Sequence, residues 1–127
     1  MRIVGIGHDQ IELARIRRTL QRHGERFLER CFTDEERRFC LGRRDPAPGL
    51  AARYAAKEAA AKALGTGVAR GISWREIEVR RRRDQRPTLH FHGRAAERAD
   101  RLGVLRAHVS LTHSRELATA FVVLEGE

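Results

Sequence analysis

The sequence contains little lysine, few aromatic residues and no long hydrophobic run. Only two of its 26 basic residues are lysines. Aromatic residues make up 6% of the chain, so the core has to rely on leucine, isoleucine, valine and alanine. No apolar segment reaches the length of a transmembrane helix, which argues against insertion into a membrane. The first residues, MRIVGIGHD, turn polar too soon for a signal peptide, so we expect a cytoplasmic protein.

Cysteine is equally scarce, with Cys31 and Cys40 lying nine positions apart. This spacing matches neither a Cys-x-x-Cys pair nor the Cys and His pattern of a zinc site, which argues against a fold stabilised by a structural metal ion. We therefore expect two buried, unreactive thiols in a reducing compartment.

The charge of the chain is strongly one-sided, at +9 over 127 residues. A basic protein attracts anionic partners, and nucleic acid, an acidic protein, a phosphorylated cofactor and a membrane surface all fit charge alone. Zinc-finger spacing and an RNA-recognition aromatic pair are both missing, and Tyr54 and Trp74 are too few for a base-stacking platform. We therefore expect neither a nucleic-acid nor a membrane partner.

Hydrophobic periodicity predicts one α+β domain, residues 1–127, with a mostly antiparallel sheet and a long alanine-rich helix. RIVGIG is typical of a buried strand, and Thr33 followed by Glu36 predicts a capping box. The expected order is a strand at 2–7, a helix at 9–24, a short helix or turn at 25–32, helices at 33–42 and 50–64, a β-hairpin at 74–93 turning at 84–87, a helix at 94–103, and strands at 106–114 and 117–126.

The alanine-rich segment RYAAKEAAAKALGTG holds both lysines. On a helical wheel Glu58 and Lys62 lie about 40° apart, and the opposite half is almost entirely alanine, which allows close packing. An ordinary surface ion pair is one interpretation of Glu58 and Lys62. The confinement of lysine to this segment, and the Gly-Thr-Gly that follows, favour a phosphate-binding role instead.

Asp9 lies in GIGHD, where we expect the first strand to have ended. It either caps the next helix or converges with Glu58 on one hard metal ion. Mg²⁺ is commonly held by one or two carboxylates, with waters and phosphate oxygens completing its shell. Two carboxylates among basic residues therefore indicate phosphoryl-group chemistry.

The third polar segment is HVSLTHS, in which alternation places His108, Ser110 and Thr112 on one face of a strand. His113 and Ser114 follow at the strand's end. Half-buried structural polar residues remain an alternative, and a hydrolase triad lacks a clear acid. The GIG segment is not G-x-G-x-x-G, and no P-loop is present, which excludes Rossmann and kinase readings.

Three segments in order, GIGHDQIELARI, RYAAKEAAAKALGTG and HVSLTHS, resemble the holo-acyl-carrier-protein synthases, the short class of 4′-phosphopantetheinyl transferases. The resemblance runs from Arg2 to about Leu124 and implies the fold of that family. It implies that phosphopantetheine passes from coenzyme A to a serine of an acidic apo acyl carrier protein, releasing adenosine 3′,5′-bisphosphate. Fatty acid biosynthesis is the expected pathway, and retention of Asp9, Glu58 and Lys62 argues against a non-catalytic homologue.

The resemblance also implies roles for individual residues. Asp9 and Glu58 would bind Mg²⁺, and Lys62 would hold a phosphate and favour the serine alkoxide. Either Lys62 or a metal-bound water would remove the proton. Lys57 is assigned to coenzyme A or to structural support. The remaining contacts with coenzyme A would come from Arg53, Gly65, Thr66, Gly67, Pro87, His113 and Ser114.

Two further expectations concern partners. The resemblance implies a homotrimer with active sites between subunits. It also implies that the first helix docks the carrier protein through Arg15, Arg22 and Arg26, although a solvated arginine face remains an alternative. The chain departs from the family pattern at Gln10 and Gln85, and the run from Arg80 to Arg83 has no role that the resemblance explains.

Overall fold

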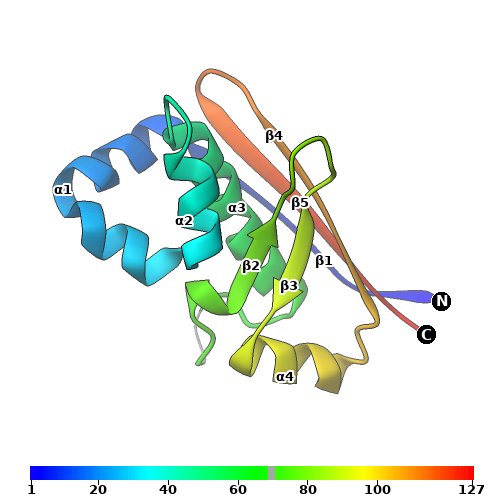
Figure 1. Ribbon diagram of the computed structural model, residues 1–127. Helices are drawn as coiled ribbons and strands as arrows, with labels where there is room; N and C mark the ends of the chain where they lie inside the picture. Colours follow the sequence, from blue (N-terminus) through cyan, green and yellow to red (C-terminus); the bar gives the residue numbers. More distant parts are fainter. Residues whose placement is uncertain (69–70) are drawn as a thin grey trace.

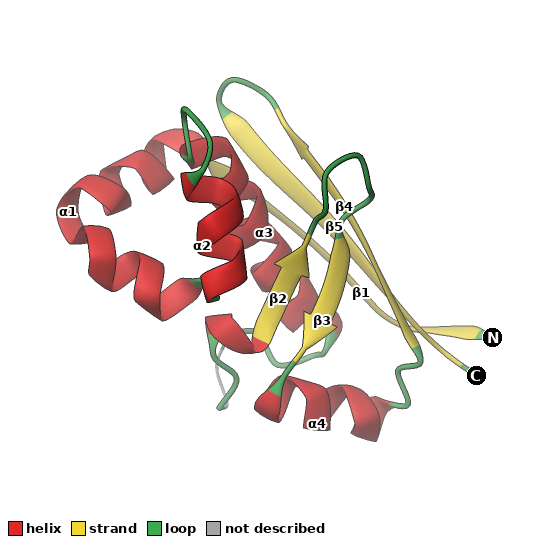
Figure 2. Ribbon diagram, viewed as in Figure 1, coloured by secondary structure: helices red, strands yellow, loops and turns green. Residues whose placement is uncertain are grey.

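The computed structural model describes residues 1–68 and 71–127, and these form an α+β fold, as predicted (Figures 1 and 2). The order of elements agrees with the prediction apart from one added 3₁₀ turn. The elements are β1 (Arg2–Glu12), α1 (Leu13–Cys31), α2 (Asp34–Leu41), α3 (Ala47–Ala63), the 3₁₀ turn η1 (Trp74–Glu76), β2 (Ile77–Arg80), β3 (Thr88–Phe91), α4 (Gly93–Leu102), β4 (Arg106–His113) and β5 (Leu117–Gly126).

The strands form two antiparallel sheets within the described residues. One has the order β1-β5-β4, and the other is the hairpin of β2 and β3. Figure 1 shows α3 lying between the three-stranded sheet on one side and α1 and α2 on the other, with the N-terminus of β1 and the C-terminus of β5 at the same end of that sheet. No helix in these residues is long and apolar enough to cross a membrane.

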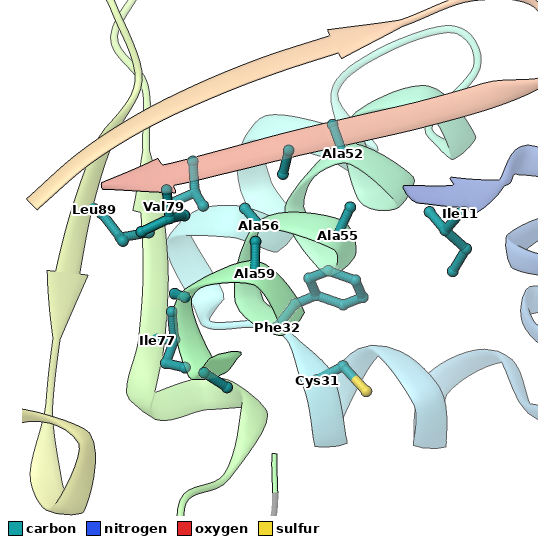
Figure 3. Close-up of a cluster of buried hydrophobic side chains, with 14 of the residues drawn as sticks. Ile11, Cys31, Phe32, Ala52, Ala55, Ala56, Ala59, Ile77, Val79 and Leu89 are labelled. Atoms are coloured by element: carbon teal, nitrogen blue, oxygen red, sulfur yellow. The ribbon is translucent and has the colours of Figure 1, made fainter. Parts of the chain in front are cut away.

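The alanine face of α3 packs directly on β1, as the composition of the helix predicts. A methyl group at Gly7 would overlap the carbonyl oxygen of Ala59, and one at Gly5 would overlap that of Ala63. The core around this contact includes Ala55, Ala56 and Ala59, which are fully buried (Figure 3). Small side chains thus bring the helix backbone within reach of β1, and this sets the distance between residues on the two elements.

The first strand differs from its prediction in length and burial. It continues past Gly7 to Glu12 because pairing with β5 continues, with Asp9 opposite Ala120. Asp9 therefore lies inside the strand, and the helix begins only at Leu13, without a side-chain cap. The alternative of Asp9 as a helix cap is wrong. The strand is also largely exposed on its outer face, where Ile6 retains 57% of its surface.

Two helix boundaries were also mispredicted. Gly24 does not end the first helix but kinks it, with φ 41° and ψ −113°, and the two predicted pieces form one bent helix. The third helix begins at Ala47 rather than Leu50. Its first turn tolerates Pro48, which has no N–H to donate, and Gly49, whose N–H needs no intrahelical partner there. The predicted capping box of Thr33 and Glu36 is confirmed.

Both cysteines are free and buried, as expected. Burial raises the pKa of Cys31 to about 11 and also raises the pKa of Cys40, so both thiols stay protonated and unreactive at neutral pH.

Candidate active site

Asp9, Glu58 and Lys62 come together where the last turns of α3 cross β1. The Nζ atom of Lys62 lies 2.9 Å from Oδ1 of Asp9 and 3.4 Å from the carbonyl oxygen of His8. Asp9 and Glu58 are partly buried, whereas Lys62 remains exposed. The contact at Gly5 and Gly7 is what brings these side chains, 53 positions apart in the case of Asp9 and Lys62, into one group.

The electrostatics of this group are those of two carboxylates held close together. The pKa of Glu58 is raised by burial and by the charge of Asp9, while Lys62 and Arg15 oppose the shift. Tyr54 lies near this group. The pKa of its hydroxyl is raised by burial and, to a smaller extent, by the charge of Glu58. Bringing a cation to the carboxylates would relieve the repulsion between them.

The donor set at Asp9 and Glu58 suits Mg²⁺. Among the described residues there is no cluster of three or more His, Cys, Asp or Glu side chains that could hold a metal. A metal ion at these two carboxylates would therefore complete its shell with other oxygen atoms, such as those of water or a bound phosphate. Mg²⁺ accepts such a shell, because it keeps several waters and binds substrate phosphates.

Arg53 points to a different side of α3 and lines a cavity of about 600 Å³. It is 3% exposed, and its Nη1 donates to the carbonyl oxygen of Gly49 at 3.2 Å. Its Nε and Nη2 atoms are buried without a hydrogen-bond partner among the residues that the structure describes. A buried charged donor without a partner is costly, so this guanidinium is suited to an anionic ligand.

The walls of the Arg53 cavity are unusually basic. The guanidinium groups of Arg53 and Arg43 lie 4.5 Å and 4.7 Å from the ring centroid of Phe39. Burial lowers the pKa of Arg53; Cys40 and Glu36 oppose this shift, and the charges of Arg81 and Arg43 add to it. The charged residues that line the cavity are Arg43, Arg53, Arg81, Arg82, Arg83, Asp45 and Asp84, and the titratable His113 also lines it.

Sequence reasoning missed the part of this wall that comes from the β2–β3 turn. The run from Arg80 to Arg83 was visible, but no pattern indicated that the turn would fold back toward α3. Asp84 adopts φ 64° in this turn, a left-handed conformation that is uncommon for a residue other than glycine. The structure joins Arg53 and His113 at this cavity as predicted neighbours, whereas Pro87 and Ser114 do not line it.

Lys57 is not available to a ligand. It is fully buried, and its Nζ lies 2.7 Å from Oε1 of Glu36, 3.0 Å from the carbonyl oxygen of Trp74 and 2.5 Å from that of Ile77. These three acceptors use all three donors of the ammonium. The geometry is incompatible with the predicted contact between Lys57 and coenzyme A, and it supports the structural alternative.

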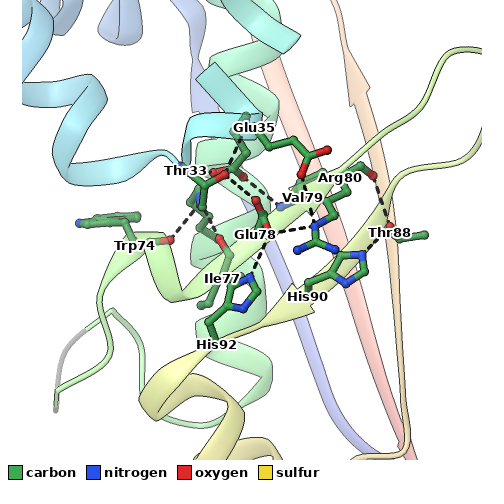
Figure 4. A network of polar contacts seen from close by, with 12 residues as sticks. Thr33, Glu35, Trp74, Ile77, Glu78, Val79, Arg80, Thr88, His90 and His92 are labelled. Atoms are coloured by element: carbon green, nitrogen blue, oxygen red, sulfur yellow. Dashed lines mark hydrogen bonds and ion pairs between the residues drawn. The ribbon is translucent and has the colours of Figure 1, made fainter. Parts of the chain in front are cut away.

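The acids around Lys57 form a larger polar network that links α2, β2 and β3 (Figure 4). Oε2 of Glu36 accepts from the amide of Val79, and Glu78 accepts from Thr33 and Arg80 and contacts Nε2 of His92. Burial alone would raise the pKa of Glu78, but its hydrogen bonds lower it to about 2. The network fixes the hairpin against α3.

The Gly-Thr-Gly loop follows α3 directly and turns back on it. Gly65 and Gly67 have φ values of 81° and 64°, which favour glycine. The amides of Thr66 and Gly67 both donate to the carbonyl oxygen of Ala61. Elsewhere, Ser114 sits in the β4–β5 turn, where its hydroxyl accepts from the amides of Glu116 and Leu117.

A second cavity, of about 410 Å³, lies in the concave side of the bent helix α1. Arg15 and Arg26 line it, as do His23 and Arg30, whereas Arg22 does not. Tyr54 and Trp74 also line it, stacked with ring centroids 4.5 Å apart. Sequence reasoning missed this apolar floor, because the kink at Gly24 was read as a helix end.

Comparison with known proteins identifies the family. The model of the 4′-phosphopantetheinyl transferase superfamily matches residues 5–122. The chain therefore belongs to the 4′-phosphopantetheinyl transferase superfamily. A holo-[acyl-carrier-protein] synthase of Methylobacterium radiotolerans is 51% identical over 127 residues, covering 97% of this chain and 93% of the relative.

Two crystal structures of holo-[acyl-carrier-protein] synthases are also similar over nearly the full chain. That from Neisseria meningitidis has a TM-score of 0.89 at 34% identity, covering 98% of this chain and 99% of the other. That from Bacillus anthracis, in complex with CoA (3′,5′-ADP), has a TM-score of 0.81 at 38% identity, covering 98% of each chain. These comparisons confirm the resemblance to holo-acyl-carrier-protein synthases. They also support the predicted reaction, the transfer of phosphopantetheine from coenzyme A to an apo carrier protein.

Proposed function

We propose that the chain carries out this transfer with Mg²⁺ held by Asp9 and Glu58, releases adenosine 3′,5′-bisphosphate, and serves the acyl carrier protein of fatty acid biosynthesis in the cytoplasm. The convergence of Asp9, Glu58 and Lys62 carries the proposal. Mg²⁺ at the two carboxylates would neutralise negative charge on the diphosphate of coenzyme A.

The chain's own residues supply orientation and charge at this centre. Lys62 is exposed, and its Nζ is held within 3.4 Å of two acceptors, Asp9 and the carbonyl of His8. A mobile ammonium in this place can transfer its hydrogen bonds to a phosphate oxygen and stabilise the charge that builds up there during transfer. Arg15, on α1, lies close enough to Glu58 to oppose the rise in its pKa. It therefore adds positive charge between the two carboxylates and α1, the helix proposed to dock the carrier.

The nucleotide end of coenzyme A is assigned to Arg53 and His113, with Gly65–Gly67, Pro87 and Ser114. Arg53 and Glu58 are five positions apart on α3, which places them about 140° apart around the helix. None of Asp9, Glu58 or Lys62 lines the Arg53 cavity. One chain thus presents Arg53 and His113 on a different surface from the metal-binding residues, whereas Gly65–Gly67 follows the end of α3 that carries Lys62. This separation favours active sites formed between two subunits.

The outer face of the three-stranded sheet offers a surface for such an assembly. Ile6 and Phe121 are 57% and 48% exposed, and Phe121 lies beside His8, with ring centroids 5.2 Å apart. Exposed apolar side chains on the open face of a sheet are typical of a subunit interface. This face supports the proposed homotrimer. Sedimentation of Phe121→Glu beside the wild type tests it, and the variant is expected to dissociate into inactive monomers.

The cavity on the concave side of α1 is the proposed site for the carrier protein. Arg15, Arg26 and Arg30 surround a floor that includes Tyr54 and Trp74, so the surface combines positive charge with an apolar pocket. Such a surface suits an acidic partner that inserts an apolar side chain. Arg22 lies outside this cavity and is assigned to long-range attraction only.

A mass measurement tests the proposed reaction. The protein is incubated with coenzyme A, Mg²⁺ and an apo acyl carrier protein, and the carrier gains the mass of one phosphopantetheine group. Glu58→Gln is expected to abolish the gain while the protein stays folded, and Asp100→Asn, an exposed change on α4, is the matched control. No gain across several carriers contradicts the function, whereas near-normal turnover of Glu58→Gln contradicts only the metal assignment.

A further inference from the structure

The end of α3 is held by a side chain from α4. Nε of Arg98 donates to the carbonyl oxygen of Leu64 at 2.9 Å, across 34 positions of sequence. Leu64 is the C-cap residue of α3 and is fully buried. Earlier carbonyls of the helix end are served locally, because Lys62 accepts from the amide of Gly65 and Ala61 accepts from those of Thr66 and Gly67. The carbonyl of Leu64, in contrast, is reached by this distant guanidinium.

The same guanidinium lies against the first residue of the loop. Nη2 of Arg98 is 3.3 Å from the position that a Cβ atom on Gly65 would occupy. Arg98 therefore bonds the C-cap residue and lies beside Gly65, where the chain turns through φ 81°. Its positive charge also sits at the C-terminal end of α3, where the helix dipole favours a cation.

The surroundings of this contact are open to solvent and basic. A cavity of about 240 Å³ lies beside it, lined by Thr66, Ile72, Arg94, Glu97, Arg98 and Arg101. The lining carries three arginines and one glutamate, so removing Arg101 instead of Arg98 changes the same local charge but leaves the hydrogen bond to Leu64 in place. Lys62 lies in the last turn of the same helix, so the loop and the proposed catalytic lysine share one support.

We propose that Arg98 is a positioning residue that fixes the Gly65–Gly67 loop in the conformation that binds coenzyme A. The inference rests on the proposed function, in which this loop contacts the nucleotide end of the substrate. Arg98 acts through the loop, and its loss lowers the fraction of molecules in which the loop is correctly placed. The apparent affinity for coenzyme A then falls by that fraction, while the chemical centre at Asp9 and Glu58 is unchanged.

Steady-state kinetics with purified full-length protein, coenzyme A and an active carrier test the proposal. Arg98→Met keeps the aliphatic stem but has no donor, and it should raise KM for coenzyme A by about fivefold or more. The KM for the carrier and kcat should stay within about twofold. Arg98→Lys should restore KM, because its Nζ lies one bond beyond the position of Nε and can still reach Leu64. Arg101→Ala, which lines the same cavity, is the matched control.

Hydrogen exchange separates positioning from a general loss of stability. Amides of residues 61–68 should exchange faster in Arg98→Met, with those of residues 50–58 unchanged, whereas a global effect would accelerate both. An unchanged KM for coenzyme A in Arg98→Met, an equal rise in Arg101→Ala, or a failure of Arg98→Lys to restore KM would overturn the inference. The wild type must show transfer in the same assay, and its inactivity would count against the proposed function instead.

Discussion

Replacing Lys57 by methionine should destabilise the protein strongly while leaving the affinity for coenzyme A in the folded fraction unchanged. Lys57 and Glu36 are both essentially absent from the surface, at 0% and 1% exposure, and their charged atoms are 2.7 Å apart. Methionine fills a similar volume but leaves the Glu36 carboxylate buried without its counter-charge. Breaking a buried ion pair from one side costs about 3–5 kcal/mol.

The lower end of that range applies because Glu36 keeps other partners. Its Oε1 also accepts from the amide of Thr33 at 2.9 Å, and its Oε2 accepts from that of Val79 at 2.9 Å. A loss of about 3 kcal/mol should lower the melting temperature of a chain of this size by roughly 10 °C or more. Denaturant and thermal unfolding measure the loss, at one fixed protein concentration because association would shift both transitions.

A double-mutant cycle makes the reasoning refutable. Glu36→Gln removes the charge from the other side, so Lys57→Met with Glu36→Gln should be more stable than the two single losses predict when added, by about 1–3 kcal/mol. Coenzyme A affinity, measured by calorimetry below the melting temperature, should match the wild type. Lost affinity in a variant of normal stability would return Lys57 to the ligand site, and additive losses would show that the pair is not coupled.

Three other perturbations test the fold and the docking surface. Gly7→Ala should destabilise the protein by several kcal/mol, because its methyl group meets the backbone oxygen of Ala59, which cannot move without shifting α3; a melting temperature equal to that of the wild type would refute the close contact. The pKa of Glu78 in the folded protein, about 2, lies below its ordinary 4.5, so its stabilisation is complete above pH 4.5 and disappears as pH falls toward 2. Wild-type unfolding free energy should therefore drop over that interval by up to about 3 kcal/mol more than that of Glu78→Gln, and parallel acid profiles of the two would exclude the effect. Arg15→Glu should raise KM for the carrier more than KM for coenzyme A, whereas equal effects would remove α1 as the docking face.

The features that the sequence predicted correctly depend on local patterns and on the size of small side chains. The alanine face of α3 needed only residue size to indicate close packing, and Gly5 and Gly7 supply the matching gap on β1. The capping box at Thr33 is likewise a local signal. Asp9 and Lys62 were predicted to lie close together, and their side chains are in contact, although Asp9 lies inside β1 and not just past its end.

The errors arose where tertiary contacts overrode local signals. Gly24 is a typical helix stop, yet packing of both halves of α1 continues the helix through a kink and creates the concave cavity. The β2–β3 turn places Arg81 in the wall of the cavity that Arg53 lines. No periodicity in the segment RRRRDQRP indicates that these two residues would be neighbours. Burial of Lys57 depended on Glu36, 21 positions earlier on another helix. Such pairings across elements are not visible in one sequence.

The two lysines of α3 are retained for different physical reasons. Lys57 needs three donors diverging from one small ammonium, and its acceptors on Glu36, Trp74 and Ile77 surround Nζ at 2.5–3.0 Å. A planar guanidinium is larger and presents its donors in a fixed fork, so arginine cannot fill this buried position. Lys62, in contrast, is exposed and free to exchange Asp9 for a phosphate oxygen. A chain that uses arginine almost everywhere else thus keeps lysine where a compact, rotatable charge is required, once in the core and once at the proposed reaction centre.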